Sequence, residues 1–334
     1  MRVFTAARVW PGGDAPVLAD TAVVVDDAGV VVGIGPIDRL RVHSARVPTK
    51  WPWIGPGIVD AHVHLAFGTP VAMRSGGVVA VRDLGAPRDR AALWRAPHGD
   101  PVVAVAGPLL TGPGGYPSRS WGKDGFAAFV ASPEEARAVV RDLADEVDVV
   151  KVALEPSGGA VPSLDEVRAA VDTAHSCGLA VTAHALTEEM VLRALDAEVD
   201  ELCHTPSERL SPATVERIAA AGVPVVSTIE TLGRRAARNA AALVAAGVTL
   251  RYGTDLGNSG TRPGADDREL RRLADAGLGN LGALRAATDG AAAAFGFPKE
   301  VTGRIEVGHR ALAVILPGDP TVDLRVFRTP LGTF

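Results

Sequence analysis

Short apolar runs alternate along this chain with longer stretches in which apolar residues recur every three or four positions. The central part holds eight such runs: residues 57–64, 77–83, 101–110, 148–154, 179–185, 199–204, 223–229 and 248–255. Runs rich in Val, Ile and Ala predict strands buried on both faces, and the intervening helical patterns predict parallel crossovers. Eight strand–helix units over about 245 residues predict an α/β fold of the (β/α)8 barrel type, with its active site at the carboxyl ends of the strands.

Two of the helical stretches carry explicit start signals. Ser132 opens a helix that we expect to run to about Glu146, and Ser163 opens one that we expect to run to about Cys177. In both, a glutamate follows the serine three positions later, so that side chains and backbone cap each other. Gly178 then follows the second helix as a stop signal.

The two ends of the chain have a different pattern, with short strands separated by turns rich in Gly, Pro and Asp. The N-terminal strands are too few to close a core alone, and the apolar run 311–316 offers a partner strand. We therefore predict a small composite β-sandwich domain built from residues 1–55 and 303–334, flanking a barrel of residues 56–302.

Composition narrows the class of protein. Hydrophobic residues make up 47% and charged residues 22% of the 334 positions, which is ordinary for a globular protein. A net charge of −5 without a block of Lys or Arg argues against a nucleic-acid or membrane partner and leaves a small-molecule substrate, with homo-oligomers possible in principle. We expect a cytoplasmic location, because no secretion signal or membrane-length apolar run is visible and two cysteines cannot form a disulfide framework.

Potential metal ligands stand at the ends of the predicted strands. His62 and His64 alternate with Val63, so both imidazoles point to one face of an extended strand. The fourth, fifth, sixth and eighth runs end with further candidates, namely Lys151, His184, His204 and Asp255. Each of these residues taken alone could be a buried structural residue. A barrel would bring all six to one rim, and this convergence indicates a metal site.

The constellation resembles the amidohydrolase superfamily of metal-dependent hydrolases, in particular its imidazolonepropionase-related and Xaa-Pro dipeptidase-related branch. The resemblance rests on segments similar to the first, fifth, sixth and eighth strand signatures of that family and to its helix after the barrel: 57–64, 181–185, 201–204, 252–255 and 284–288. It covers nearly the whole chain, and it implies a barrel flanked by a β domain made from both termini.

The resemblance also implies a ligand set for two divalent metal ions. His62, His64 and Asp255 would hold one ion and His184 and His204 the other, while Lys151 would bridge both as a carbamate formed with carbon dioxide. An unmodified ammonium has no lone pair for a metal, whereas a carbamate offers two anionic oxygens. A lysine buried against a carboxylate is the alternative for Lys151. Zinc is the expected ion for imidazole-rich ligation, although manganese, cobalt or iron would also fit.

The implied reaction is hydrolysis of an amide, lactam or related carbonyl C–N bond, other than a peptide bond, by a hydroxide that bridges the two metals. Asp255 would act as the general base and His204 would help to polarise the carbonyl. Tyr116 and Arg119, in the loop of residues 111–122, are candidate substrate contacts. The loop reads Gly-Gly-Tyr where peptidase relatives have Gly-Gly-His, and Leu186 replaces a tyrosine, so dipeptidase activity is not indicated.

Two other functions stay open at this point. Deamination of a heterocycle by a one-metal site would need a glutamate two or three residues after His184, where Leu186 and Thr187 stand, with Glu188 and Glu189 further along. A non-catalytic scaffold on the same fold would not need a complete ligand set. The number of bound metal ions separates the three functions.

Two further polar side chains lie near the predicted rim. Asp83 ends the second strand run, where we expect a role in holding the rim together, with orientation of a metal-bound histidine as the alternative. Cys203 precedes His204, and strict strand alternation predicts that its thiol packs on the opposite face.

Overall fold

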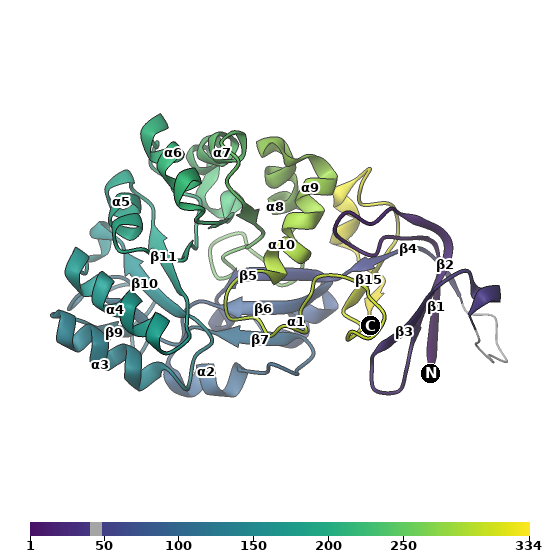
Figure 1. The fold of residues 1–334 in the computed structure, drawn as a ribbon, viewed down its shortest axis with the longest axis horizontal. Helices are drawn as coiled ribbons and strands as arrows, with labels where there is room; N and C mark the ends of the chain where they lie inside the picture. Colours follow the sequence, from purple (N-terminus) through teal and green to yellow (C-terminus); the bar gives the residue numbers. More distant parts are fainter. Residues whose placement is uncertain (41–48) are drawn as a thin grey trace.

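Two sheets of parallel strands surround a common interior in the computed structural model, which describes residues 1–40 and 49–334. The smaller sheet has the order β5 (Ile58–Val63), β6 (Val78–Asp83), β7 (Val102–Val105). The larger sheet has the order β14 (Leu250–Arg251), β13 (Val225–Val226), β12 (Glu201–Leu202), β11 (Val181–Ala185), β10 (Val150–Leu154), β8 (Leu109–Thr111), β9 (Ala127–Phe129). Figure 1 shows helices along the outside of these strands.

Backbone hydrogen bonds at two seams close the sheets into a barrel. At the seam between β14 and β5, the Asp255 amide donates to the His62 carbonyl over 2.8 Å, and the His64 amide donates to the Leu256 carbonyl over 2.9 Å. On the other side, the Asp148 amide, two residues before β10, donates to the Val105 carbonyl of β7 over 2.8 Å. The predicted (β/α)8 barrel is confirmed.

The third apolar run is not one strand, as predicted, but two. β7 pairs with β6, whereas β8 pairs with β10 and with β9. Gly107 lies between the two strands with a φ of +64°, a backbone conformation that glycine adopts readily, and the chain changes its neighbours there. The sequence run of residues 101–110 was continuous because both pieces are buried.

Helices follow most of the barrel strands: α1 (Pro70–Ser75), α2 (Arg88–Trp94), α3 (Pro133–Leu143), α4 (Leu164–Ser176), α5 (Glu188–Asp196), α6 (Pro212–Ala221), α7 (Ile229–Ala245), α8 (Asp267–Leu273), α9 (Gly279–Ala286) and α10 (Asp289–Ala292). One π-helical turn (Ala274–Leu278) and 3-10 turns (Ile37–Arg39, Leu65–Phe67, Pro156–Gly158, Leu324–Arg328) complete the helical elements of the described chain.

The serine start signals cap α3 and α4 as predicted. The Ser132 hydroxyl accepts a hydrogen bond from the Glu135 amide over 3.1 Å, and Ser163 forms a complete capping box with Glu166. The α3 helix ends a few residues before the predicted Glu146. No helix of the described chain is long and apolar enough to cross a membrane.

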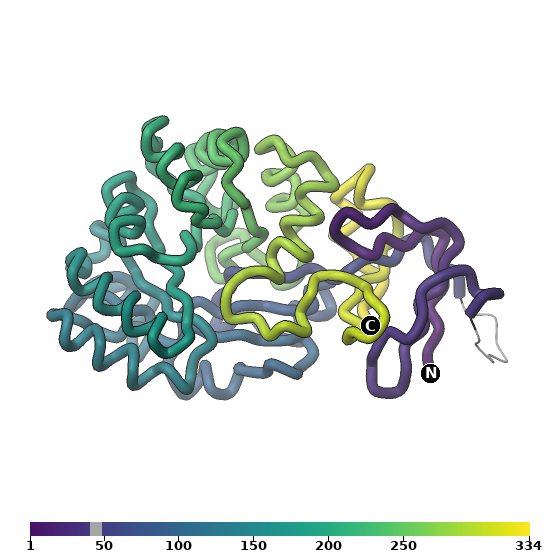
Figure 2. Tube along the Cα trace, in the orientation of Figure 1, coloured from purple at the N-terminus to yellow at the C-terminus, as the bar shows by residue number. Residues whose placement is uncertain are grey.

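A six-stranded sheet combines the two ends of the chain. Its order is β16 (Gly332–Thr333), β15 (Ala313–Leu316), β4 (Lys50–Pro56), β1 (Arg2–Val9), β2 (Leu18–Val25), β3 (Val31–Gly35). β15 pairs antiparallel with β4, so that Ile315 lies opposite Ile54. Figure 2 shows both termini beside this sheet, at one side of the barrel. The prediction of a small β domain built from both termini is confirmed.

Ionic side chains fill the barrel interior near the amino ends of the strands. Glu201 on β12 is fully buried and pairs with the guanidinium groups of Arg82 and, at 2.7 Å, Arg251. The Thr182 hydroxyl donates a further hydrogen bond to Glu201 over 2.9 Å. Burial raises the pKa of Glu201, but the two arginines more than offset this effect and hold its pKa below the usual value.

Glu201→Gln should destabilise the barrel by about 3–5 kcal/mol, because two buried guanidinium groups lose the charge that compensates them. Urea unfolding followed by circular dichroism measures this loss. Arg88→Ala is the control, since Arg88 forms its ion pairs with Asp142 and Glu146 on the surface and should contribute about 0–1 kcal/mol. Equal losses in the two variants would contradict a structural role for the Glu201 network.

Candidate metal centre

The six predicted ligands are all buried, and each belongs to a barrel strand or to the segment that follows one. His62 and His184 are next to last in β5 and β11, and His64, His204 and Asp255 follow the ends of β5, β12 and β14 by one, two and four residues. The expectation that Lys151 ends its strand is wrong, because Lys151 is the second residue of β10. Because the parallel strands end at one rim, residues almost two hundred positions apart in sequence become neighbours.

One group of three ligand atoms meets between β5 and β14. His62 Nε2 and His64 Nε2 each lie 3.5 Å from Asp255 Oδ1. The ligand atoms of these three residues all lie within 4.8 Å of one another. His62 Nε2 is buried and has no hydrogen-bond partner in the described chain. A buried nitrogen without a partner is costly in a finished core, and a metal ion would satisfy it.

Backbone carbonyls fix the orientation of the first two imidazoles. His62 Nδ1 donates to the Cys203 carbonyl over 2.8 Å, and His64 Nδ1 faces the Gly85 carbonyl at 3.4 Å. An imidazole that donates through Nδ1 keeps its lone pair on Nε2. Both Nε2 atoms therefore present lone pairs toward Asp255, which is the usual arrangement of histidines that bind a metal.

The other two histidines are oriented by side chains. His184 Nε2 lies 3.1 Å from Glu155 Oε2, and His204 Nδ1 lies 3.0 Å from the Thr228 hydroxyl. Their ring centroids are 4.7 Å apart. His184 joins neither of the ligand groups in which every atom lies within 4.8 Å of the others, so the structure gathers the second predicted set less tightly than the first.

Lys151 lies among these groups with its side chain 1% exposed. Its Nζ is 2.7 Å from Cys203 Sγ, and no ion pair joins it to a carboxylate of residues 1–40 or 49–334. The predicted packing of Cys203 on the opposite face is wrong, because β12 ends at Leu202 and strand alternation does not extend to the next residue. The thiol faces the site.

Burial keeps the imidazoles neutral. It lowers the pKa of all four histidines, with the nearby Lys151 or a second histidine adding to the effect, and the pKa of His64 falls to about 3. Burial also raises the pKa of Asp255 to about 6, although Lys151 acts in the opposite direction. Neutral imidazole is the form that binds metals. The donor set therefore fits one or more divalent metal ions.

Two carboxylates hold the rim in place. Asp60 accepts hydrogen bonds from the Thr254 hydroxyl over 2.6 Å, from the Thr254 amide and from the His62 amide. Asp83 accepts from the amides of Leu65 at 2.7 Å and Gly85 at 3.1 Å, which agrees with the expected rim role. These bonds fix the backbone on both sides of the His62 and His64 pair.

An aromatic loop covers the imidazoles. The Tyr116 ring stacks on His184 with centroids 5.1 Å apart, and its hydroxyl accepts a hydrogen bond from Trp121 Nε1 over 2.8 Å. The Trp121 ring lies 4.7 Å from that of His64. Arg119, the other predicted contact in this loop, is exposed.

Sequence reasoning missed two groups around the site. Glu155 directly follows the fourth strand run, and Thr228 stands near the end of the seventh, so both positions were usable signals for polar groups at the rim. Trp121 belongs to the loop of residues 111–122, whose aromatic residues were expected near the substrate, but its contact with His64 depends on the course of that loop.

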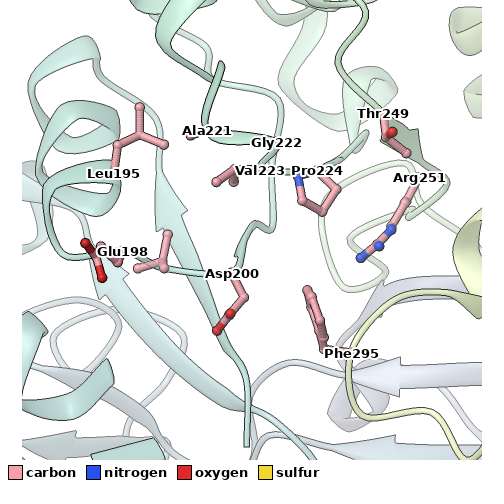
Figure 3. Close-up of a pocket in the computed structure, with 11 residues that line it drawn as sticks. Leu195, Glu198, Asp200, Ala221, Gly222, Val223, Pro224, Thr249, Arg251 and Phe295 are labelled. Atoms are coloured by element: carbon pink, nitrogen blue, oxygen red, sulfur yellow. The ribbon is translucent and has the colours of Figure 1, made fainter. Parts of the chain in front are cut away.

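A separate pocket lies at the opposite ends of the strands. Figure 3 shows its lining, which includes Asp200, Pro224, Thr249, Arg251 and Phe295. Asp200, Pro224 and Thr249 directly precede β12, β13 and β14. Active sites of (β/α)8 barrels form at the carboxyl ends, so this pocket is not the candidate catalytic site.

Several curated proteins are similar in sequence to part of this chain. An uncharacterized protein of Mycobacterium tuberculosis (strain H37Rv) is 29% identical over 215 residues, which cover 58% of this chain and 55% of that protein. The chain thus matches little more than half the length of such curated relatives. Imidazolonepropionase of Burkholderia cenocepacia is 24% identical over 223 residues, covering 60% of this chain and 46% of the enzyme.

Solved structures agree with the fold. A Xaa-Pro dipeptidase with bound methionine superposes with a TM-score of 0.80 at 19% identity, covering 98% of this chain and 96% of that chain. The sequence model of the Amidohydrolase family matches residues 53–330, which comprise the barrel and the β15 strand of the small sheet. This protein belongs to the amidohydrolase family.

Proposed function

We propose that this protein is a binuclear metal-dependent hydrolase that cleaves an amide, lactam or related carbonyl C–N bond of a small molecule. The observation that carries the proposal is the convergence of His62, His64 and Asp255, with the buried Nε2 of His62 left without a partner. Membership of the amidohydrolase family supports hydrolysis as the reaction.

The proposed ligand assignment follows the two sides of the rim. His62, His64 and Asp255 hold one ion, and His184 and His204 hold the second. Bound zinc ions would lower the pKa of a shared water and polarise the substrate carbonyl. Since no carboxylate pairs with Lys151 in the part of the chain described, its amine is available to carbon dioxide. Attack of Nζ on carbon dioxide forms the N–C bond and releases a proton, which leaves an anionic carbamate between the two ligand sets.

Asp255 is the proposed proton carrier. Its two oxygens face different histidines, with Oδ1 at 3.5 Å from His64 Nε2 and Oδ2 at 4.0 Å from His204 Nδ1. From this position it can accept a proton from the attacking water and deliver it to the leaving nitrogen. Thr228 holds the His204 ring in place while this transfer occurs.

The aromatic loop forms the proposed substrate side. Tyr116 and Trp121 lie directly against His184 and His64, so that a substrate carbonyl at the metals would place its neighbouring groups beside these rings. Arg119 is the exposed cation of the same loop, and we propose that it pairs with an anionic group of the substrate.

The contacts of Glu188 argue against the deaminase alternative. Its carboxylate accepts hydrogen bonds from the Ser211 amide over 2.7 Å and from the Thr214 hydroxyl over 2.5 Å. Glu188 thus connects α5 to the start of α6, and its carboxylate is engaged there and not at His184.

Metal analysis of the purified protein should find about two ions per chain, as a dinuclear site requires. Lys151→Ala should lower this number and abolish turnover, because the bridging carbamate is lost. Lys123→Ala, at an exposed position, is the matched control and should keep both ions. Plasma mass spectrometry gives the count. One ion per chain would support the deaminase alternative, and none would support a scaffold.

Asp255→Asn should lower kcat by a factor of about 10²–10⁴, because an amide cannot accept the proton of the attacking water. The assay is a metal-loaded screen of N-acyl amino acids, lactams, cyclic imides and lactones. Metal content is measured on the same samples, and Asp27→Asn at an exposed position is the control. Full turnover by Asp255→Asn with its metals bound would exclude Asp255 as the base.

Arg119→Ala should raise KM for anionic substrates and leave KM for neutral substrates of similar size unchanged, because only the former lose an ion pair. Steady-state kinetics on a matched pair of substrates gives this comparison. Arg90→Ala is the control, since Arg90 is an exposed arginine on α2. A parallel change for both kinds of substrate would mean that Arg119 shapes the loop and does not bind charge.

A further inference from the structure

We propose that the thiolate of Cys203 is itself a ligand of the metal centre, so that the centre has a sulfur donor beside its nitrogen and oxygen donors. The proposal rests on the metal centre proposed above. The first supporting observation is that His62, Cys203 and His204 form another group of possible ligands. Their ligand atoms all lie within 4.8 Å of one another, and all three residues are buried.

Cys203 takes part in the site through both its backbone and its side chain. Its carbonyl accepts the hydrogen bond from His62 Nδ1 that orients the first imidazole. Its side chain is fully buried, rests on Leu84, Ala106 and Val149, and directs Sγ toward Lys151 Nζ. A thiol that served only as packing would be surrounded by apolar groups, whereas Sγ of Cys203 lies 2.7 Å from Lys151 Nζ and within 4.8 Å of a ligand atom of His62 and of His204.

The unpartnered nitrogen of His62 gives independent support. His62 belongs to both ligand groups, and its Nε2 is buried and has no hydrogen-bond partner within the described residues. The rings of His62 and His204 are 4.5 Å apart, and they belong to opposite sides of the proposed pair of ions. A sulfur that reaches both histidines therefore lies where the two ions would meet.

The thiolate and the carbamate are compatible neighbours. A carbamate retains one hydrogen on Nζ, and Cys203 Sγ at 2.7 Å can accept it. Sulfur has further lone pairs that remain free for a metal. The same contact would thus hold the carbamate beside Cys203 and leave Sγ able to bind a metal.

A sulfur ligand also changes which metal the site prefers. Thiolate is a soft donor that favours zinc and cobalt over manganese and magnesium, and it would add to the preference for zinc that the imidazoles already give. We expect Cys203→Ser to reduce the preference for zinc over manganese in competitive loading, because a hydroxyl is a harder donor.

The test uses the full-length protein stripped of metal and loaded with cobalt(II). Wild-type protein should show a near-ultraviolet sulfur-to-cobalt charge-transfer band together with the visible bands of bound cobalt. Cys203→Ser should keep the visible bands and lose the charge-transfer band. Cys177→Ser is the matched control, because Cys177 is the other cysteine of the chain, is exposed at the end of α4 and should leave both features unchanged.

A second measurement needs no variant. X-ray absorption at the zinc edge of the wild-type protein should show a Zn–S distance of about 2.3 Å in addition to the shorter distances to nitrogen and oxygen. Bound zinc or cobalt without any sulfur signal would overturn the role of Cys203 and leave the metal centre intact. Failure of the wild-type protein to bind either metal would overturn the proposed function as well.

Discussion

The seam where β14 meets β5 is the constraint on which the site depends. The Asp60 carboxylate accepts hydrogen bonds from the hydroxyl and the amide of Thr254, and the Asp255 amide donates to the His62 carbonyl. These bonds join two segments almost two hundred residues apart. Asp255 has a φ of +53°, a left-handed conformation that aspartate tolerates better than most residues. The turn at this position and the seam together place the carboxylate between two imidazoles.

Burial then determines the chemistry that the seam makes available. Four imidazoles lie close together in one buried rim, and burial lowers the pKa of every one of these histidines. Neutral imidazoles leave lone pairs that water does not reach, such as Nε2 of His62. A bound cation would satisfy these buried lone pairs and so would stabilise the folded rim. Metal binding and the stability of the rim are therefore linked.

The strand pattern predicted the barrel and the rim positions because both depend on local features, namely apolar runs and the residues that end them. The break at Gly107 was missed because both flanking strands are buried, although Gly107 followed by Pro108 was a usable turn signal within the run. The orientation of Cys203 was predicted wrongly because alternation holds only within a strand, and β12 has just two residues. Trp121 depended on the course of a loop, which no periodicity specifies.

The same strands serve stability and chemistry at successive positions. Glu201 on β12 neutralises two buried arginines, and just beyond the end of β12 Cys203 meets Lys151 and His204 reaches the rim. On β11, Thr182 bonds to Glu201, and His184 two residues later stacks on Tyr116. Side chains two apart on a strand share a face, so on β11 His184 stands directly above Thr182 and the Glu201 network. The ionic layer is rigid because every charge in it has a partner. A rigid layer of this kind keeps the ligand side chains of the rim in position before a metal ion binds.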